Sequence, residues 1–158
     1  MPSRSAPTST PWLTPATPSR RKVAVCAAAV SDWRVADRAA EKLKKRGGQT
    51  PELRLVTNPD ILASLSEAGP DRPRLVVGFA AETDTVIPNA RDKLERKGCD
   101  WIIANDVSQE GVMGGDRNTI RLIARDGIES WPTASKQAVA DRLVERIVDY
   151  FTENTADA

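Results

Sequence analysis

Lysines at two places in the sequence have the type and spacing to bind phosphate. Lys42, Lys44 and Lys45 form a positive cluster just before two glycines, and lysines beside a flexible loop can neutralise a phosphate group. Lys93 and Lys97 are four residues apart, so on a helix they share one face, where an anion would relieve their repulsion. Both patterns also have a simpler interpretation. A lysine run is commonly a solvated surface, and cations near a helix C-terminus complement its dipole.

At three further places, the kind of residue and its position suit a nucleotide-binding site. Asn58, Pro59 and Asp60 predict a helix start, with Asn58 as the cap, and helix N-termini can bind anions. Phe79 ends an apolar segment, where it can either stack on a nucleobase or pack in the core. Asp32 follows another apolar segment, where a carboxylate can hold a metal or a ribose hydroxyl, or simply form a turn.

The composition excludes several kinds of catalytic site. The chain has no histidine, which removes the commonest general base, the commonest zinc ligand and the Ser-His-Asp triad. Cys26 and Cys99 lie in no paired metal or redox motif, so we expect two buried, reduced thiols. Residues 111–116 are glycine-rich but lack the Gly-Lys-Ser/Thr ending of a P-loop.

The overall charge and hydropathy give no reason to expect binding to nucleic acid or to a membrane. The formal net charge is +1, which gives no argument for binding nucleic acid or a membrane, so any anion site must be local. No apolar run approaches the roughly 20 residues that span a bilayer. Residues 1–21 are rich in Pro, Ser and Thr and are predicted to be disordered. We therefore expect a cytoplasmic protein.

The elements that must position these side chains follow an α/β order. Apolar residues 22–30, 74–79 and 100–104 predict strands buried on both faces of a parallel sheet, and residues 52–56 alternate like a half-exposed strand. Residues 59–68 and 85–97 predict helices, while residues 31–34 predict a polar loop, and a further helix could begin at residue 36. A mostly parallel, helix-flanked sheet follows, and in such sheets ligands gather at the carboxyl ends of the strands.

A small antiparallel extension is predicted after the parallel strands. Residues 118–124 read as a strand, and Asp126 with Gly127 predicts a hairpin to residues 128–131. Thr133 or Ser135 can cap a last helix, whose apolar stripe is Val139, Leu143, Ile147 and Tyr150 with Phe151. One domain is thus expected over residues 22–152, with a tail at 153–158.

The motifs, taken in order, resemble the phosphopantothenoylcysteine synthetase (phosphopantothenate–cysteine ligase) family, the C-terminal part of a bifunctional coenzyme A biosynthesis flavoprotein. The resemblance covers about residues 22–151. The segments that carry it are 27–34 (AAAVSDWR), 42–45 (KLKK), 58–61 (NPDI), 77–83 (VGFAAET), 93–98 (KLERKG), 104–108 (ANDVS), 111–118 (GVMGGDRN) and 129–132 (ESWP). The fold that the resemblance implies is Rossmann-like.

The resemblance implies CTP-dependent ligation of 4′-phosphopantothenate to cysteine through an acyl-cytidylate, with Mg²⁺. Lys42 would be the catalytic lysine that stabilises charge at the reacting phosphate and carbonyl, and residues 46–52 would be a flap over the intermediate. Asp32 would contact the nucleotide or its Mg²⁺. The remaining nucleotide-binding residues implied are Cys26, Ala27 and Ala28 for the base pocket, Pro59, Asp60, Ile61, Leu62 and Phe79 for the cytidine, and Lys93 and Lys97 for the triphosphate.

The sequence also departs from the family pattern. The family's domain begins with a glycine-rich segment that recognises phosphopantothenate, and nothing before Lys22 resembles it. Ser31 stands where the family has alanine. We therefore expect a domain truncated on its N-terminal side, a homodimer as in the family, and a separate N-terminal half as a partner. The alternative is a non-catalytic CTP-binding or assembly fragment that lacks the phosphopantothenate-recognition half.

Overall fold

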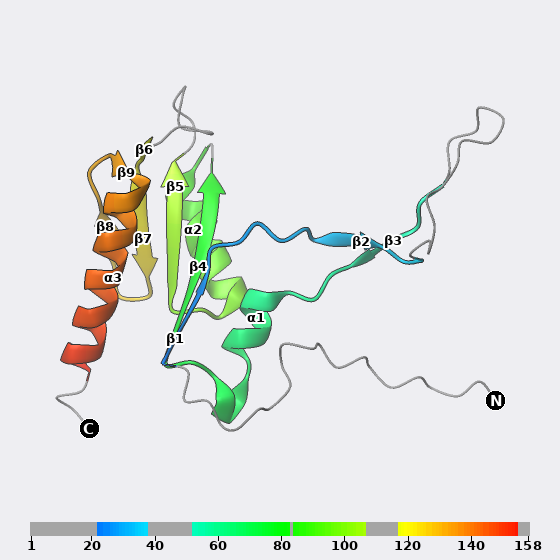
Figure 1. Cartoon of the computed structure of the whole chain (residues 1–158), viewed down its shortest axis with the longest axis horizontal. Helices are drawn as coiled ribbons and strands as arrows, with labels where there is room; N and C mark the ends of the chain where they lie inside the picture. Colours follow the sequence, from blue (N-terminus) through cyan, green and yellow to red (C-terminus); the bar gives the residue numbers. More distant parts are fainter. Residues whose placement is uncertain (1–21, 38–51, 83, 107–116, 155–158) are drawn as a thin grey trace.

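The central element of the fold is a five-stranded sheet with the strand order β1-β4-β5-β7-β8 (Figure 1). The computed structural model describes residues 22–37, 52–82, 84–106 and 117–154. β1 (Val23–Cys26), β4 (Leu75–Glu82) and β5 (Trp101–Asp106) are parallel. β7 (Ile120–Ala124) and β8 (Ile128–Ser130) extend the sheet in antiparallel fashion. The predicted mostly parallel sheet with a small antiparallel extension is confirmed.

Helices cover both faces of this sheet. α1 (Ile61–Ser66) and α2 (Val86–Lys97) pack on one face, where Leu62 and Leu94 join a core cluster with Val76 and Ile102. α3 (Lys136–Glu153) packs on the other face. Its core cluster contains Leu75, Val77, Trp101, Ile103, Ile120, Leu122, Trp131, Val139 and Leu143. The apolar stripe predicted for the last helix is the stripe that α3 buries.

Local signals explain where the two longer helices begin and end. α2 ends at Gly98, whose φ of 63° is the left-handed conformation that glycine adopts without steric cost, as the sequence predicted. Ser135 caps α3, because its hydroxyl accepts a hydrogen bond from Ala138 N at 3.1 Å. Neither these helices nor α1 is long and apolar enough to cross a membrane within the part of the chain that the structure describes.

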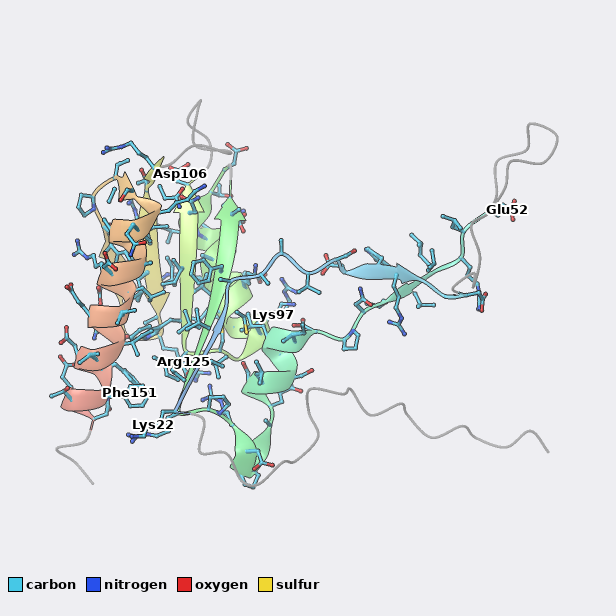
Figure 2. The ribbon with its side chains drawn as sticks, in the orientation of Figure 1. Lys22, Glu52, Lys97, Asp106, Arg125 and Phe151 are labelled. Atoms are coloured by element: carbon cyan, nitrogen blue, oxygen red, sulfur yellow. The ribbon has the colours of Figure 1, made fainter. Side chains whose placement is uncertain are left out.

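A two-stranded arm projects from the body of the domain. β2 (Trp33–Val35) pairs in antiparallel fashion with β3 (Leu55–Thr57), and the arm extends away from the central sheet, with Glu52 near its far end (Figures 1 and 2). Trp33 is 57% exposed and Leu55 is 55% exposed. A second small sheet joins β6 (Arg117–Asn118) to β9 (Ala134–Ser135), and a 3₁₀ turn spans Gly69–Asp71.

A guanidinium group ties the end of α1 to the amino ends of β4 and β5. Arg72 donates to Ser66 O at 3.0 Å, at the end of α1, and to Asp100 Oδ1 at 2.9 Å. Asp100 Oδ2 in turn accepts from Val76 N at 2.7 Å. Each partly buried polar atom in this network therefore has a partner, which fixes α1 relative to β4 and β5.

Several local predictions were wrong, and the strand predicted at residues 52–56 forms only at Leu55–Thr57. The apolar run at residues 22–30 forms a strand only at Val23–Cys26, and that strand is a half-exposed edge, because only β4 pairs with it among the described residues. Residues 31–34 are not all loop, since Trp33 begins β2. α1 begins two residues later than predicted: Asp60 is the cap, while Asn58 bonds to the arm. The possible helix from residue 36 falls mostly outside the described residues.

Candidate functional site

A cavity of about 650 Å³ lies at the carboxyl end of β1, between that strand, the start of α1 and one face of α2. Such a volume is typical of small-molecule sites. The side chains and backbone that line it are Val25, Cys26, Ala27, Ala28, Val30, Ser31, Asp32, Trp33, Thr57, Asn58, Pro59, Asp60, Ile61, Leu62, Phe79, Lys93, Arg96 and Lys97. The carboxyl end of a parallel strand is where α/β sheets bind ligands.

The two lysines of α2 both face this cavity, as their spacing predicted. Lys93 Nζ donates a hydrogen bond to Phe79 O at 2.8 Å. Lys97 lies one turn further on, beside the start of α1 (Figure 2), and forms an ion pair with Asp60. Arg96 adds a third cation to the lining. One helix thus brings three cations to the pocket, of which Lys97 is paired with Asp60 and Arg96 with Asp92 at 3.8 Å.

Asp60 has two roles at the opposite wall. Its Oδ1 accepts from Ala63 N at 3.0 Å and caps α1, while its Oδ2 pairs with Lys97. Burial by itself raises the pKa of the Asp60 carboxyl. The hydrogen bonds from Lys97 and from Ala63 N, with the charges of Lys97 and Arg96, outweigh burial and hold the pKa below its usual range. The carboxylate is therefore ionised at neutral pH.

Gly78 lets α1 approach the sheet closely enough to form this wall. A Cβ placed on Gly78 would lie 2.5 Å from Leu62 Cδ2 and 2.9 Å from Ile102 Cδ1. Both distances are shorter than van der Waals contact allows. Leu62 belongs to the first turn of α1. Because position 78 has no side chain, this turn can lie close to the sheet, and that closeness determines the position of the pocket wall formed by α1.

The base of the arm forms the third wall. Arg34 Nη1 donates to Thr57 O at 2.8 Å and to Asn58 Oδ1 at 3.2 Å. Asn58 donates in return, through Nδ2 to Ser31 O at 2.7 Å and through its backbone N to Asp32 O at 2.8 Å. These bonds hold the segment that carries Asp32 against the segment that leads into α1. Asp32 itself is exposed at the rim.

Burial sets the chemistry of the two thiols differently. Cys26 lines the pocket and is half-buried, and burial raises its pKa. Cys99 lies in the core, and burial raises its pKa to about 11. Both groups are therefore neutral thiols at pH 7, and neither has the lowered pKa of a nucleophilic cysteine. The expectation of two buried thiols holds fully only for Cys99.

The structure brings most of the predicted site residues together. Around this one cavity lie Cys26, Ala27, Ala28, Asp32, Pro59, Asp60, Ile61, Leu62, Phe79, Lys93 and Lys97. Lys42, the predicted catalytic lysine, lies outside the described residues, as do residues 46–51 of the predicted flap and the glycine-rich loop. The predicted disordered segment at 1–21 and most of the tail also lie outside them. What each of these residues binds stays a prediction.

Several pocket residues were missed by reasoning from the sequence. Arg96 sits between the two lysines, and its place on the cavity side depends on how α2 is set against α1. Trp33 lies in the family motif at residues 27–34, but the sequence does not show that it lines the pocket. Its position there depends on β2 pairing with β3, which starts the arm at the edge of the cavity. Asn58 was expected to cap a helix, and its place in the wall depends on Arg34, which is distant in sequence.

Comparisons with known proteins agree on one family. The family model described as "DNA/pantothenate metabolism flavoprotein C-terminal domain" matches residues 14–151. The "Coenzyme A biosynthesis bifunctional protein CoaBC" of Haemophilus influenzae is 39% identical over 132 residues, which is 84% of this chain and 32% of that protein. This chain thus spans about a third of the length of that curated relative.

Solved structures give the same result for the fold. The crystal structure of the C-terminal domain of a CoaBC protein superposes with a TM-score of 0.62 at 27% identity, covering 84% of this chain and 56% of that one. A Cab2 mutant in complex with phosphopantothenate-cysteine superposes with a TM-score of 0.53 at 20% identity, covering 82% of this chain and 45% of that one. The second likeness is one of fold alone.

Proposed function

Because the chain belongs to the DNA/pantothenate metabolism flavoprotein C-terminal domain family, we propose that its pocket binds CTP for the ligation of 4′-phosphopantothenate to cysteine in coenzyme A biosynthesis. The observation that carries the proposal is the convergence of Lys93, Arg96 and Lys97 on one cavity at the carboxyl end of a parallel strand. Cations on a rigid helix, facing a cavity of this volume, suit a polyphosphate with an attached nucleoside.

The triphosphate is proposed to lie along α2. Lys97 is 17% exposed in its side chain and is already paired with a carboxylate, so it can exchange that partner for a phosphate oxygen without becoming unpaired. Lys93 is held by a backbone carbonyl, which keeps its ammonium group at the cavity wall. The cytidine would then occupy the part of the pocket formed by Ala27, Ala28 and Phe79.

Mg²⁺ fits the donor groups of this pocket. The ion usually binds through one or two carboxylates together with substrate phosphates, so a cluster of protein ligands is not needed. No group of three His, Cys, Asp or Glu side chains gathers within the described residues, but the carboxylates of Asp32 and Asp60 both line the cavity. We propose Asp32 as the group that would hold the ion, which would supply charge neutralisation at the phosphates.

The reaction proposed has two balanced steps. The phosphopantothenate carboxylate attacks the α-phosphorus of CTP, forming an acyl-cytidylate and releasing pyrophosphate. The neutral cysteine amine then attacks the acyl carbon, the amide forms as the acyl–phosphate bond breaks and CMP leaves, and the amine proton is released to solvent. Charge builds up on phosphate oxygens in the first step, where Lys93 and Lys97 would stabilise it. Lys42 is proposed to act at the same reacting centre.

The assembly proposed is a homodimer formed through the arm. An isolated two-stranded sheet is marginally stable in water, and this one exposes Trp33 and Leu55, with Leu53 exposed just before β3. A second copy of the chain would cover these side chains. Light scattering should give twice the chain mass for the wild type and a monomer for Leu55→Lys. The cytoplasmic location stays a prediction.

The direct test of the function is an amide-formation assay with phosphopantothenate, cysteine and CTP, run on this chain alone and with a supplied N-terminal half. Product from the chain alone supports the full ligase activity. Product only with the supplied half indicates that this chain needs a separate phosphopantothenate-recognition half, and CTP binding without product supports the alternative, a non-catalytic CTP-binding fragment. No product in either case, together with no binding of CTP by the chain, would contradict both.

A further inference from the structure

Arg34 joins two segments of the pocket wall without lining the pocket itself. It lies in β2 at the base of the arm, directly after Trp33, which does line the cavity. Its Nη1 donates to Thr57 O at 2.8 Å and to Asn58 Oδ1 at 3.2 Å. Both acceptors belong to residues of the cavity wall. Any effect of Arg34 on a ligand in the cavity is therefore exerted through the wall that it holds.

The bond from Arg34 determines which way the Asn58 amide faces. An asparagine side chain has one oxygen, which accepts hydrogen bonds, and one NH₂ group, which donates them. A guanidinium group can only donate, so it bonds to Oδ1 and leaves Nδ2 to donate to Ser31 O at 2.7 Å. The reversed amide would place two donors together on one side and two acceptors together on the other. Arg34 thus selects the orientation in which both bonds form.

Asn58 in turn holds the loop that carries Asp32. Its Nδ2 bonds to Ser31 O, and its backbone N donates to Asp32 O at 2.8 Å. Residues 27–32, which we call the loop wall, follow β1, and every one of them is exposed. Packing therefore contributes little to the position of this loop. The bonds to Asn58 place it against the segment that leads into α1.

The two lysines of α2 are held independently of these bonds. Lys93 donates to a backbone carbonyl of β4 at 2.8 Å, and Lys97 pairs with Asp60, the cap of α1. α1 is itself anchored on the sheet by Leu62, which belongs to a core cluster. Loss of the Arg34 bonds should therefore release the loop wall and leave these lysines in place.

We propose that Arg34 is a positioning residue for nucleotide binding. Through Asn58 it holds the loop wall in the place where the nucleoside part of CTP would contact it. The inference rests on the proposed function for the identity of the ligand. A wall that is already in position need not be ordered when the ligand binds, so its release should lower the affinity for CTP. A bare triphosphate on the α2 cations has no nucleoside to contact this wall, so its affinity should not change.

The test compares CTP with inorganic triphosphate by calorimetric titration of the full chain, both without Mg²⁺. Arg34→Met keeps a long side chain but removes its donors. It should weaken CTP binding at least tenfold and change triphosphate binding less than twofold. Arg54→Met is the matched control, because Arg54 is an exposed guanidinium of the same arm that pairs with Asp37, and neither residue lines the cavity. This control should change neither affinity.

A double-mutant cycle tests whether Arg34 acts through Asn58. Asn58→Ala removes the amide and leaves Arg34 in place, so it should also weaken CTP binding at least tenfold. This single variant also keeps the test decisive if Arg34→Met does not fold. Residues that act as one unit are not additive, so Arg34→Met added to Asn58→Ala should change CTP binding less than twofold further. A further tenfold loss would mean that Arg34 acts by another route and would overturn the proposal.

Hydrogen exchange at the Asn58 N–H, measured without ligand, separates this proposal from the proposed function. Because that group bonds to Asp32 O, Arg34→Met should speed its exchange at least tenfold and leave the exchange of Leu62 unchanged. Absence of CTP binding by the wild type would contradict the proposed function, and the exchange rate would still show whether Arg34 holds the wall. Unchanged exchange, unchanged CTP affinity in Arg34→Met, or an equal loss of CTP and triphosphate binding would overturn the positioning role.

Discussion

Asp60 and Lys97 form an ion pair across the mouth of the pocket, and the same carboxylate caps α1. The pair joins the start of one helix to the end of another, so it sets the width of the cavity. It also places a negative charge beside the cations that would bind a triphosphate. Ligand binding must therefore displace the carboxylate from Lys97 or share the lysine with it.

Asp60→Asn should strengthen the binding of a bare polyphosphate. Asparagine caps a helix about as well as aspartate, so α1 should persist, while the negative charge is lost and Lys97 becomes available. We expect inorganic triphosphate without Mg²⁺ to bind roughly fivefold more tightly, which is about 1 kcal/mol for one unit charge near a partly exposed site. Calorimetric titration measures it. Asp71→Asn, in the exposed 3₁₀ turn, is the matched control, and weaker binding by Asp60→Asn alone would contradict the account.

The same carboxylate predicts a pH dependence of stability. The pKa of Asp60 is lowered in the folded chain, so its contribution to the free energy of unfolding is present above the unfolded value of about 3.9 and is lost as the pH falls through the folded value. The difference in stability between the wild type and Asp60→Asn should therefore be largest at neutral pH and shrink below about pH 4. Urea unfolding between pH 7 and pH 3 checks it. A difference that grows on acidification would have the wrong sign.

Gly78→Ala should weaken both the fold and the pocket. The added Cβ would meet Leu62 Cδ2 at 2.5 Å and Ile102 Cδ1 at 2.9 Å, so these side chains must move or α1 must shift away from the sheet. We expect a loss of about 1–3 kcal/mol in the free energy of unfolding, as for other overpacked cores, and weaker nucleotide binding. Gly127→Ala is the matched control, because a Cβ there meets nothing within 4 Å. Equal effects of the two substitutions would show that close packing at position 78 is unimportant.

Cys26 should report on occupation of the pocket. It is half-buried in the cavity wall, whereas Cys99 is fully buried in the core. A neutral thiol reagent should therefore modify Cys26 first, slowly at pH 7 because burial raises its pKa, and faster as the pH rises. CTP with Mg²⁺ should slow the modification at least several-fold. Mass spectrometry of the labelled peptides measures both rates, and a rate unchanged by CTP at saturating concentration would place the nucleotide elsewhere.

The parts of the fold that could be predicted are those with strong local signals. Leu75 to Phe79 is a continuous apolar run, and it forms most of the buried strand β4. The apolar residues from Val139 to Phe151 repeat at the helical period, and they form the buried face of α3. Gly98 ends α2 because it adopts the left-handed backbone conformation of a helix C-cap, which depends on the residue type and not on distant partners. The lysines of α2 share a face for the same reason, since helical spacing is a local property.

The parts that could not be predicted depend on partners distant in sequence. The run at residues 22–30 is as apolar as a buried strand, but it pairs only with β4 among the described residues, and the strand ends at Cys26. β2 has three residues and exists only because β3 pairs with it. Asn58 has the type of a helix cap, yet Arg34 and Ser31 engage it, so the cap passes to Asp60. The structural preference of a single residue does not show whether it will bond to its neighbours in sequence or to residues distant in sequence.

The binding of CTP by the α2 cations is the central claim, and thermal unfolding with nucleotides tests it most directly. CTP with Mg²⁺ should raise the melting temperature of the wild type more than ATP or UTP does. Lys93→Ala combined with Lys97→Ala should abolish the rise, while Lys136→Ala, an exposed lysine at the start of α3, should leave it unchanged. Equal, negligible shifts for all three nucleotides with the wild type, or a full CTP shift in the double variant, would contradict the account.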